Sequence, residues 1–379
     1  MKPGTTPALF IGLMSGTSLD GVDGVLAHFA ADGTMRVLAS ATVPFDAAFR
    51  CELLSLNTPG ANELHRSALA GNQIALHYAR VVDQLREQAR SEILSGQQIA
   101  AVGAHGQTVR HQPGHGSDSY TLQLINPALL AERTGLTVVA DFRSRDIAAG
   151  GQGAPLVPAF HRQVFAQPGA DVAVLNLGGI ANLSVLPADP AQPVLGFDCG
   201  PGNVLLDAWC QQHTAHAYDA GGHWGAGGNC LPALLQTLQD EPFFALPPPK
   251  STGRDLFSPG WLQDKLSRFA SARPQDVQAT LAELTASACA TCVDSYAKNS
   301  KQLIVCGGGA FNVNLLQRLQ SRLPATRVLT SDRCGLPAMQ VEAAAFAWLA
   351  RQTMLGQAGN LAAVTGATGP RILGAIYPA

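Results

Sequence analysis

The same order of strands and turns occurs twice in this chain, and this repeat limits the folds that it can adopt. In the first half the order is ALFIGLM (8–14), the turn SGTSLDG, VDGVLAHF (22–29) and MRVLASATVPF (35–45). In the second half it is DVAVLNL (171–177), the turn Gly178-Gly179, IANLSVLP (180–187) and PVLGFD (193–198). The repeat predicts two α/β halves of common design, each with a glycine turn at the tip of a hairpin.

Further helices and strands follow each set of hairpins. We expect helices at about 61–90, from Asn126-Pro127, from Asn203, at about 274–298 and at 337–354, and strands at 99–106, 120–124, 137–142 and 302–306. The Gly- and Ala-rich stretch 147–158 marks a crossing between domains. A chain of 379 residues is long enough for two domains. We place them at 1–135 with about 355–379, and at 136–354.

The charge balance argues against a polyanionic partner. Lys and Arg number 25 against 27 Asp and Glu, so no long-range field favours nucleic acid or an anionic membrane. No run of 18 apolar residues is present, and the N-terminus MKPGTTPALF lacks the regions of a secretory signal. We therefore expect a soluble, cytoplasmic protein that acts on a small molecule, with no nucleic-acid and no membrane partner.

The cysteines and histidines show no metal-binding spacing. The close pair Cys289 and Cys292 lies in a segment with helical apolar periodicity, and no second C-x-x-C motif completes a zinc site. The ten histidines form no H-E-x-x-H motif. We expect the paired cysteines to be buried thiols.

Three glycine-rich turns stand at strand ends: Gly16 to Gly21, Gly178-Gly179 and Gly307 to Gly309. Backbone N–H groups in such turns can converge on phosphate oxygens, because glycine has no Cβ to block the approach. One such turn is more often a plain hairpin. Three in this order could hold a polyphosphate between two domains while the third packs against a nucleotide base. No P-loop or G-x-G-x-x-G motif is present, and GTSLD lacks the last glycine of a nucleophile elbow.

Two carboxylates stand out by their surroundings. Asp198 ends the apolar strand PVLGFD and precedes CGPGN, so its side chain should project from a strand end. Glu342 has the apolar helical neighbours Ala345, Phe346 and Leu349, and a carboxylate is rarely buried without a partner. The alternative for Glu342 is a helix-edge position that reaches solvent.

Seven segments together resemble the anhydro-N-acetylmuramic acid kinase family. They are, in order, GLMSGTSLDGVD, GAHGQT, ADFRSRDIAAGGQGAP, NLGGIANLS, FDCGPGN, PPPKSTGRD and CGGGAFN, and they extend over nearly the whole chain. The resemblance implies two duplicated ribonuclease-H-like α/β domains, as in the acetate kinase, sugar kinase, Hsp70 and actin superfamily, with ATP and Mg²⁺ in a central interdomain cleft. It also implies a homodimer that cleaves the 1,6-anhydro bond of a cell-wall amino sugar and phosphorylates O6 during peptidoglycan recycling.

The resemblance also assigns the nucleotide site. The first phosphate loop would consist of Gly16, Thr17, Ser18, Leu19, Asp20, Gly21, Val22 and Asp23, completed by Gly178, Gly179, Gly307, Gly308 and Gly309. Asp20 would hold Mg²⁺ or its waters, because a carboxylate suits a hard cation that bridges phosphates. The alternative for Asp20 is an Asx-turn residue that stabilises the hairpin.

The matching residues of the family imply the catalytic roles. Asp198 would remove a proton from the water that attacks the anomeric carbon, and Glu342 would orient that water. The γ-phosphoryl group would capture O6, so the nucleotide would replace a general acid.

The resemblance places the sugar beside ADFRSRDIAAGGQGAP. Either Arg143 or Arg145 would hold the lactyl carboxylate, and we expect one of the two to pair with Asp146. The remaining candidates are Gly153, Ala154 and Pro155 as a wall, Asn182, and His105 with Gln107. For His105, a core position satisfied by the backbone is an equal alternative.

Two other functions remain open from the residues alone. In a plain sugar kinase, Asp198 would deprotonate a hydroxyl group of the sugar instead of water. In an Hsp70-like or actin-like switch, hydrolysis of ATP would only change the shape of the protein.

Overall fold

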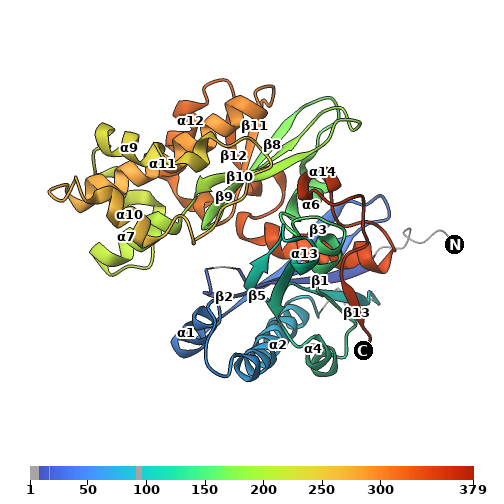
Figure 1. Cartoon of the computed structure of the whole chain (residues 1–379). Helices are drawn as coiled ribbons and strands as arrows, with labels where there is room; N and C mark the ends of the chain where they lie inside the picture. Colours follow the sequence, from blue (N-terminus) through green and yellow to red (C-terminus); the bar gives the residue numbers. More distant parts are fainter. Residues whose placement is uncertain (1–7, 17, 91–95) are drawn as a thin grey trace. The chain divides into compact units, whose positions relative to one another are not determined.

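The computed structural model describes residues 8–16, 18–90 and 96–379 (Figure 1). The chain forms two compact units: unit 1 is Met1–Phe160 with Gln340–Ala379, and unit 2 is His161–Met339. These bounds differ from the expected ones at 135 and 355. They differ because β7 (Val138–Ala140) pairs with β4 in the sheet of unit 1, and because α13 (Val341–Met354) packs on β1 of that sheet.

Unit 1 contains most of the predicted elements of the first half. Its elements are β1 (Ala8–Met14), β2 (Gly21–Phe29), β3 (Met35–Pro44), α1 (Ala47–Ser55), α2 (Glu63–Gln88), β4 (Ile99–Ala104), β5 (Gln107–Gln112), η1 (Gly116–Asp118), β6 (Tyr120–Leu124), α4 (Pro127–Thr134), β7, α5 (Ser144–Ala148), α13, α14 (Ala362–Thr365) and β13 (Ala375–Tyr377). The chain passes into unit 2 within α6 (Val157–Phe165).

Unit 2 likewise follows the expected order. Its elements are β8 (Val172–Leu177), β9 (Ile180–Leu186), β10 (Leu195–Pro201), α7 (Val204–Thr214), η2 (Ala220–Gly222), α8 (His223–Ala226), α9 (Pro232–Gln239), η3 (Pro242–Ala245), α10 (Pro259–Leu266), α11 (Pro274–Tyr296), β11 (Gln302–Cys306), η4 (Gly308–Phe311), α12 (Val313–Arg322), β12 (Arg327–Thr330) and η5 (Ser331–Cys334). The chain returns to unit 1 within η6 (Ala338–Gln340).

The main sheets of the two units share a five-strand order. Over the described residues, one runs β13-β7-β4-β1-β2-β3 and the other β10-β9-β8-β11-β12. In each, the first three strands of the unit form antiparallel hairpins, and two later strands, β4 and β7 in unit 1 or β11 and β12 in unit 2, add in parallel on the side of the first strand. In unit 1, β13 also pairs antiparallel with β7, and β5 and β6 form a separate two-stranded sheet. This shared order, numbered 3-2-1-4-5 within each unit, confirms the predicted fold class of duplicated ribonuclease-H-like α/β domains.

Glycines let helices lie close against the sheet of unit 1. A Cβ on Gly12 of β1 would overlap the Ala343 carbonyl of α13, and one on Gly103 of β4 would overlap that of Phe346. On the other face, a Cβ on Gly24 would overlap Val81 of α2. Helix α13 therefore covers one face of this sheet and α2 the other (Figure 1). The first turn of α13, with Glu342, is thereby fixed to β1.

Unit 2 has a corresponding core. Alternate residues of β8, β9, β10 and β11 pack against α11 and α12, and a second cluster joins α7, α9, α10 and α11. Cys289 and Cys292 are buried in the first cluster, as predicted, and they are free thiols. Within the described residues, no helix is both long and apolar enough to cross a membrane.

Candidate active site

The first glycine turn connects β1 to β2 in unit 1. Ser18 and Asp20 are exposed at its tip, and the Ser18 hydroxyl donates a 2.7 Å hydrogen bond to Oδ1 of Asp20. Leu19 has a left-handed backbone (φ 58°) and a side chain only 6% exposed, so it anchors the turn in the core. The turn therefore presents Gly16, Ser18 and Asp20 outward. Thr17 lies outside the described residues.

The last three residues of the predicted loop belong to β2. Gly21 and Val22 pair with Pro44 and Val43 of β3, and the Val22 side chain is buried in the core. Because the side chains of Leu19 and Val22 are both buried in the core, these two residues can offer a ligand main-chain atoms at most. Asp23 is half-buried and accepts a 2.6 Å hydrogen bond from the Thr42 hydroxyl.

Three carboxylates of unit 1 lie near one another. Burial raises the pKa of Glu342, and the charges of Asp23 and Asp20 raise it further, while Arg143 opposes the shift. Burial and the charge of Asp20 also raise the pKa of Asp23, against the Thr42 hydrogen bond. The structure thus joins the first turn, predicted from its glycines, to Glu342 in α13. Mutual repulsion of this kind favours a cation beside the cluster.

Buried His105 and half-buried Arg143 form a hydrogen-bonded pair. Nε and Nη2 of Arg143 donate to Nε2 of His105 at 3.1 and 2.9 Å. Since arginine can only donate, Nε2 must be the unprotonated ring nitrogen, so Nδ1 carries the proton toward the Ser15 carbonyl at 3.3 Å. Burial and the Arg143 charge lower the pKa of His105 to about 3. His105 is therefore neutral and is satisfied within the fold.

Gln107 is also part of this buried network. Its Oε1 accepts a 2.5 Å hydrogen bond from the Ser15 hydroxyl, and its amide donates to the Thr108 carbonyl. The side chain is almost fully buried. Gln107 and His105 thus support the residue that precedes the first glycine turn.

The expected pairing of an arginine with Asp146 is wrong for the described residues, among which no ion pair involves Asp146. Its carboxylate, fully buried, instead accepts from the Gly153 N–H at 2.8 Å, from Asn360 Nδ2 at 2.6 Å and from the Thr365 hydroxyl at 2.8 Å. Neutral donors satisfy it because they are supplied by its own loop and by the C-terminal segment.

The two arginines occupy different environments. Arg143 donates from Nη1 to the Gly153 carbonyl at 2.7 Å, and burial lowers its pKa to about 10. Arg145 is exposed on α5. Arg143 and Asp146 together thus hold Gly153 in place. The next two residues, Ala154 and Pro155, are joined by a cis peptide bond.

In unit 2, backbone hydrogen bonds join the second glycine turn to the start of α7. The N–H groups of Gly202 and Val204 donate to the Gly179 carbonyl, and that of Asn203 donates to the Gly178 carbonyl at 2.9 Å. A Cβ on Gly202 would overlap the Gly178 carbonyl oxygen. The turn and the helix terminus therefore hold each other in place.

The third glycine segment lies directly against the second. A Cβ on Gly309 would overlap the Leu177 side chain, and one on Gly307 would overlap the Asn176 amide. Gly308 is exposed between them. The structure thus brings together the two glycine segments of unit 2, Gly178-Gly179 and Gly307 to Gly309.

A row of paired residues leads across the sheet from that point to Asp198. Cys306 pairs with Asn176, Asn176 with Asn182, and Asn182 with Asp198, on the adjacent strands β11, β8, β9 and β10. Paired residues on neighbouring strands project to the same face, and three strand spacings cover roughly 14 Å. Asn182, predicted to contact substrate, therefore lies beside Asp198.

The carboxyl group of Asp198 is held by a segment from elsewhere in unit 2. Its Oδ2 accepts from the Thr252 N–H at 2.9 Å and from the Ser251 hydroxyl at 3.0 Å. Burial raises the pKa of Asp198 to about 6, against the lowering by these hydrogen bonds and by Lys250. A carboxyl group with that pKa can accept a proton at neutral pH and release it again.

Sequence reasoning did not assign Ser15, Ser251, Thr252, Asn360 or Thr365. Ser251 and Thr252 stand in the quoted motif PPPKSTGRD, but nothing in the sequence joins them to Asp198, 53 and 54 residues away. Asn360 is 214 residues from Asp146. Local patterns carry no signal for such distant partners.

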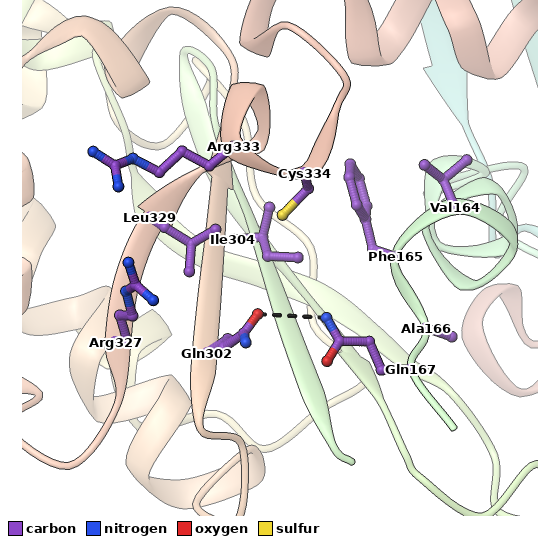
Figure 2. Close-up of a pocket in the computed structure, with 10 residues that line it drawn as sticks. All are labelled: Val164, Phe165, Ala166, Gln167, Gln302, Ile304, Arg327, Leu329, Arg333 and Cys334. Atoms are coloured by element: carbon purple, nitrogen blue, oxygen red, sulfur yellow. Dashed lines mark hydrogen bonds between the residues drawn. The ribbon is translucent and has the colours of Figure 1, made fainter. Parts of the chain in front are cut away.

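A hollow of about 640 Å³ in unit 2 contains none of the predicted site residues (Figure 2). It is lined by Val164, Phe165, Ala166, Gln167, Gln302, Ile304, Arg327, Leu329, Arg333 and Cys334. Gln167 donates a long, 3.4 Å hydrogen bond to Gln302 across it. Since Arg327 and Arg333 direct their guanidinium groups away from Phe165 in Figure 2, this hollow is no candidate for the active site.

Two solved structures are distantly similar to this chain. Component A of (R)-2-hydroxyglutaryl-CoA dehydratase from Acidaminococcus fermentans matches with a TM-score of 0.48 at 12% identity, covering 92% of this chain and 100% of that chain. A ROK family glucokinase from Streptomyces griseus, in complex with glucose and AMPPNP, matches with a TM-score of 0.41 at 16% identity, covering 91% of this chain and 100% of that chain. The fold is identified by the sheet topology and not by these similarities.

Sequence relatives are much closer. Proteins named anhydro-N-acetylmuramic acid kinase from Variovorax paradoxus and Ralstonia nicotianae are 63% and 56% identical to this chain. The alignments cover 98% of this chain in both cases, and 99% and 97% of the relatives. The family profile described as anhydro-N-acetylmuramic acid kinase matches residues 8–379. The chain therefore belongs to the anhydro-N-acetylmuramic acid kinase family.

Proposed function

We propose that this protein opens the 1,6-anhydro ring of 1,6-anhydro-N-acetylmuramic acid with water and transfers the γ-phosphoryl group of ATP to O6. The product is N-acetylmuramic acid 6-phosphate, and the reaction belongs to peptidoglycan recycling. The observation that carries this proposal, beside family membership, is Asp198: a held carboxyl group with a pKa of about 6 at the end of a polar row.

Asp198 acts as the general base. It takes a proton from water as the water oxygen bonds to the anomeric carbon and the bond from that carbon to O6 breaks. O6 then bonds to the γ-phosphorus, and ADP leaves. Glu342 orients the attacking water. This role is supported by the partial burial of Glu342, which raises the pKa of its carboxyl group.

The glycine segments hold the nucleotide. In unit 2, Gly178, Gly179, Gly307 and Gly308 are partly or fully exposed, and buried Gly309 packs against Leu177; in unit 1, the first turn presents Gly16, Ser18 and Asp20. Exposed main chain without Cβ atoms is the type of surface that phosphate oxygens and a base can approach closely.

Mg²⁺ fits the carboxylates of unit 1. No group of three His, Cys, Asp or Glu residues forms a metal site within the described part of the chain. A single exposed carboxylate, Asp20, backed by the charges of Asp23 and Glu342, suits instead a hydrated Mg²⁺ that arrives with the nucleotide. When bound, the ion would neutralise charge on the transferring phosphoryl group.

Arg145 is the better candidate for the lactyl carboxylate of the sugar. Arg143 already donates to His105 and to the Gly153 carbonyl, whereas Arg145 is exposed. Arg143 then fixes the wall formed by Gly153, Ala154 and Pro155. Asn182, beside Asp198, supplies an amide for the sugar. In unit 1, His105 and Gln107 hold Ser15, which precedes the first glycine turn. We also propose a homodimer in the cytoplasm, on family grounds.

An assay of ADP release tests this function. With ATP, Mg²⁺ and the anhydro sugar, we expect ADP and the 6-phosphate in equal amounts, and no ADP above background with glucosamine or without sugar. In water enriched in ¹⁸O, the label should enter the anomeric position during turnover. Phosphorylation without label would show a plain sugar kinase, and ATP hydrolysis independent of sugar would favour a conformational switch.

A further inference from the structure

One short segment contacts Asp198 at three points. The Asp198 N–H donates to the Lys250 carbonyl at 3.1 Å, and the Ser251 hydroxyl and Thr252 N–H donate to Oδ2 at 3.0 and 2.9 Å. Main chain and side chain of Asp198 are thus both fixed by Lys250–Thr252. Both donors to the carboxyl group use the same oxygen. Among the described residues, no hydrogen bond reaches Oδ1.

The segment is itself fastened to β10. Lys250, 9% exposed, places Nζ 3.4 Å from the carbonyls of Phe243 and Phe244 and 4.7 Å from the centre of the Phe243 ring. Phe244 packs on Gly200, where a Cβ would come within 2.6 Å of its ring. Gly200 follows a bulge in β10 that starts at Asp198. The buried ammonium group of Lys250 therefore joins the two ends of the loop from Phe243 to Thr252. One end of this loop contacts Gly200 and the other contacts Asp198, on either side of the bulge in β10.

We propose that Lys250–Thr252 is a positioning element for the general base: Ser251 and Thr252 hold Oδ2, so that Oδ1 is the atom that takes the proton from water. The inference rests on the proposed function. An oxygen that already accepts two hydrogen bonds has less electron density to offer, whereas the other oxygen keeps its lone pairs free. Ser251 is thus a positioning residue that acts through Asp198.

The same contacts set the pH range of the base. Within unit 2, the charge of Lys250 acts on Asp198, Asn182 on β9 pairs with it, and the Cys199 thiol on β10 interacts with it, while Cys292 on α11 interacts with Cys199 and Lys250. Lys250 lowers the pKa of Asp198, and the Ser251 and Thr252 hydrogen bonds lower it too. The pKa values of both thiols are raised, so they are neutral. Removing the Ser251 hydroxyl would remove one of the hydrogen bonds that counter the effect of burial, so the pKa of Asp198 should rise.

The test compares Ser251→Ala with Ser251→Thr, which keeps the hydroxyl, and with Ser271→Ala at an exposed position. We expect the acidic limb of the kcat profile of Ser251→Ala to move up by roughly one pH unit. At pH 6 its kcat should then fall about fivefold, and at pH 8.5 it should stay within about twofold of the wild type. Ser251→Thr and Ser271→Ala should keep the wild-type profile. An unmoved limb, with or without a uniform loss of rate, would overturn the proposal.

A titration without turnover separates this inference from the proposed function. In protein labelled with ¹³C at aspartate carboxyl groups, the Asp198 resonance is identified by its loss in Asp198→Asn. It should titrate at higher pH in Ser251→Ala, and also in Lys250→Met, than in the wild type. If the wild type phosphorylated no anhydro sugar but these shifts were present, the proposed function would fail and the hydrogen-bonded clamp would stand. Unchanged titration in both variants would refute the clamp.

Discussion

The backbone N–H of Thr252 donates a 2.9 Å hydrogen bond to Oδ2 of Asp198, across 54 residues of sequence. Together with the Ser251 hydroxyl, it holds a carboxyl group that burial drives toward its neutral form. The two donors that orient the base therefore also oppose the rise in its pKa caused by burial, and loss of the Ser251 hydroxyl should alter both properties.

Replacing Asp198 by Asn should abolish turnover while the sugar still binds. An amide keeps an oxygen for the Ser251 and Thr252 donors but cannot accept a proton, so kcat should fall by about 10³-fold. Calorimetry should give a dissociation constant for the sugar within a few fold of the wild type. A near-normal kcat would remove Asp198 from the mechanism.

The same substitution should stabilise unit 2 at alkaline pH. The folded pKa of Asp198, about 6, lies above its ordinary value of 3.8, so the folded state favours the protonated acid. The contribution of Asp198 to the free energy of unfolding is therefore fully present below pH 3.8 and is lost as the pH rises through 6. In urea, Asp198→Asn should gain about 1–2 kcal/mol over the wild type at pH 8 and nothing at pH 3.5. Equal gains at both pH values would contradict this linkage.

Asp146 should be a structural residue of unit 1. Asp146→Ala leaves the Gly153 N–H, Asn360 and Thr365 without their acceptor, so unfolding free energy should fall by about 3 kcal/mol. Asp146→Asn, which keeps one acceptor oxygen, should lose less. Asp83→Ala on the exposed side of α2 is the matched control, and its urea midpoint should not change. A midpoint of Asp146→Ala equal to that of the control would show that the three donors find other partners.

Gly202→Ala should weaken nucleotide binding. The added Cβ would push the start of α7 away from the Gly178 carbonyl and so displace the second glycine turn. Under the proposed role of that turn, the dissociation constant of AMPPNP should rise about tenfold, or ~1.4 kcal/mol. In the control Gly260→Ala in α10, the added Cβ would lie 3.7 Å from the Ser258 hydroxyl oxygen, an ordinary contact distance. This variant should leave the dissociation constant of AMPPNP unchanged. Normal AMPPNP binding by Gly202→Ala would separate the turn from the nucleotide.

Hairpin strands and long helices could be predicted because their signals are local. Strand 35–45 is found as β3 (Met35–Pro44), the helix at about 61–90 as α2 (Glu63–Gln88), and strand 302–306 as β11 (Gln302–Cys306). Each has an apolar period and a glycine, proline or polar boundary that few other structures would satisfy. The repeated strand order then follows from the sequence of turns.

Shorter or long-range features could not be predicted in this way. The short helix α5 and the edge strand β13 have too few residues for a period, and β13 exists through its pairing with β7. The charge environment of Glu342 depends on Asp20 and Asp23 of the first turn and β2, and on Arg143, which the fold of unit 1 brings near α13. Residue types suggested candidates, but contacts decided that Arg143 points to His105 and that Asp146 has neutral partners.

Unit 1 is discontinuous, because Met1–Phe160 is completed only by Gln340–Ala379. On the ribosome, β1 and β4 emerge long before α13, the helix whose backbone lies on their glycines. Unit 2 is contiguous and can mature first during translation. The N-terminal sheet keeps Gly12 and Gly103 uncovered until α13 has been synthesised, so we expect nascent chains halted before α13 to be prone to aggregation and to chaperone capture.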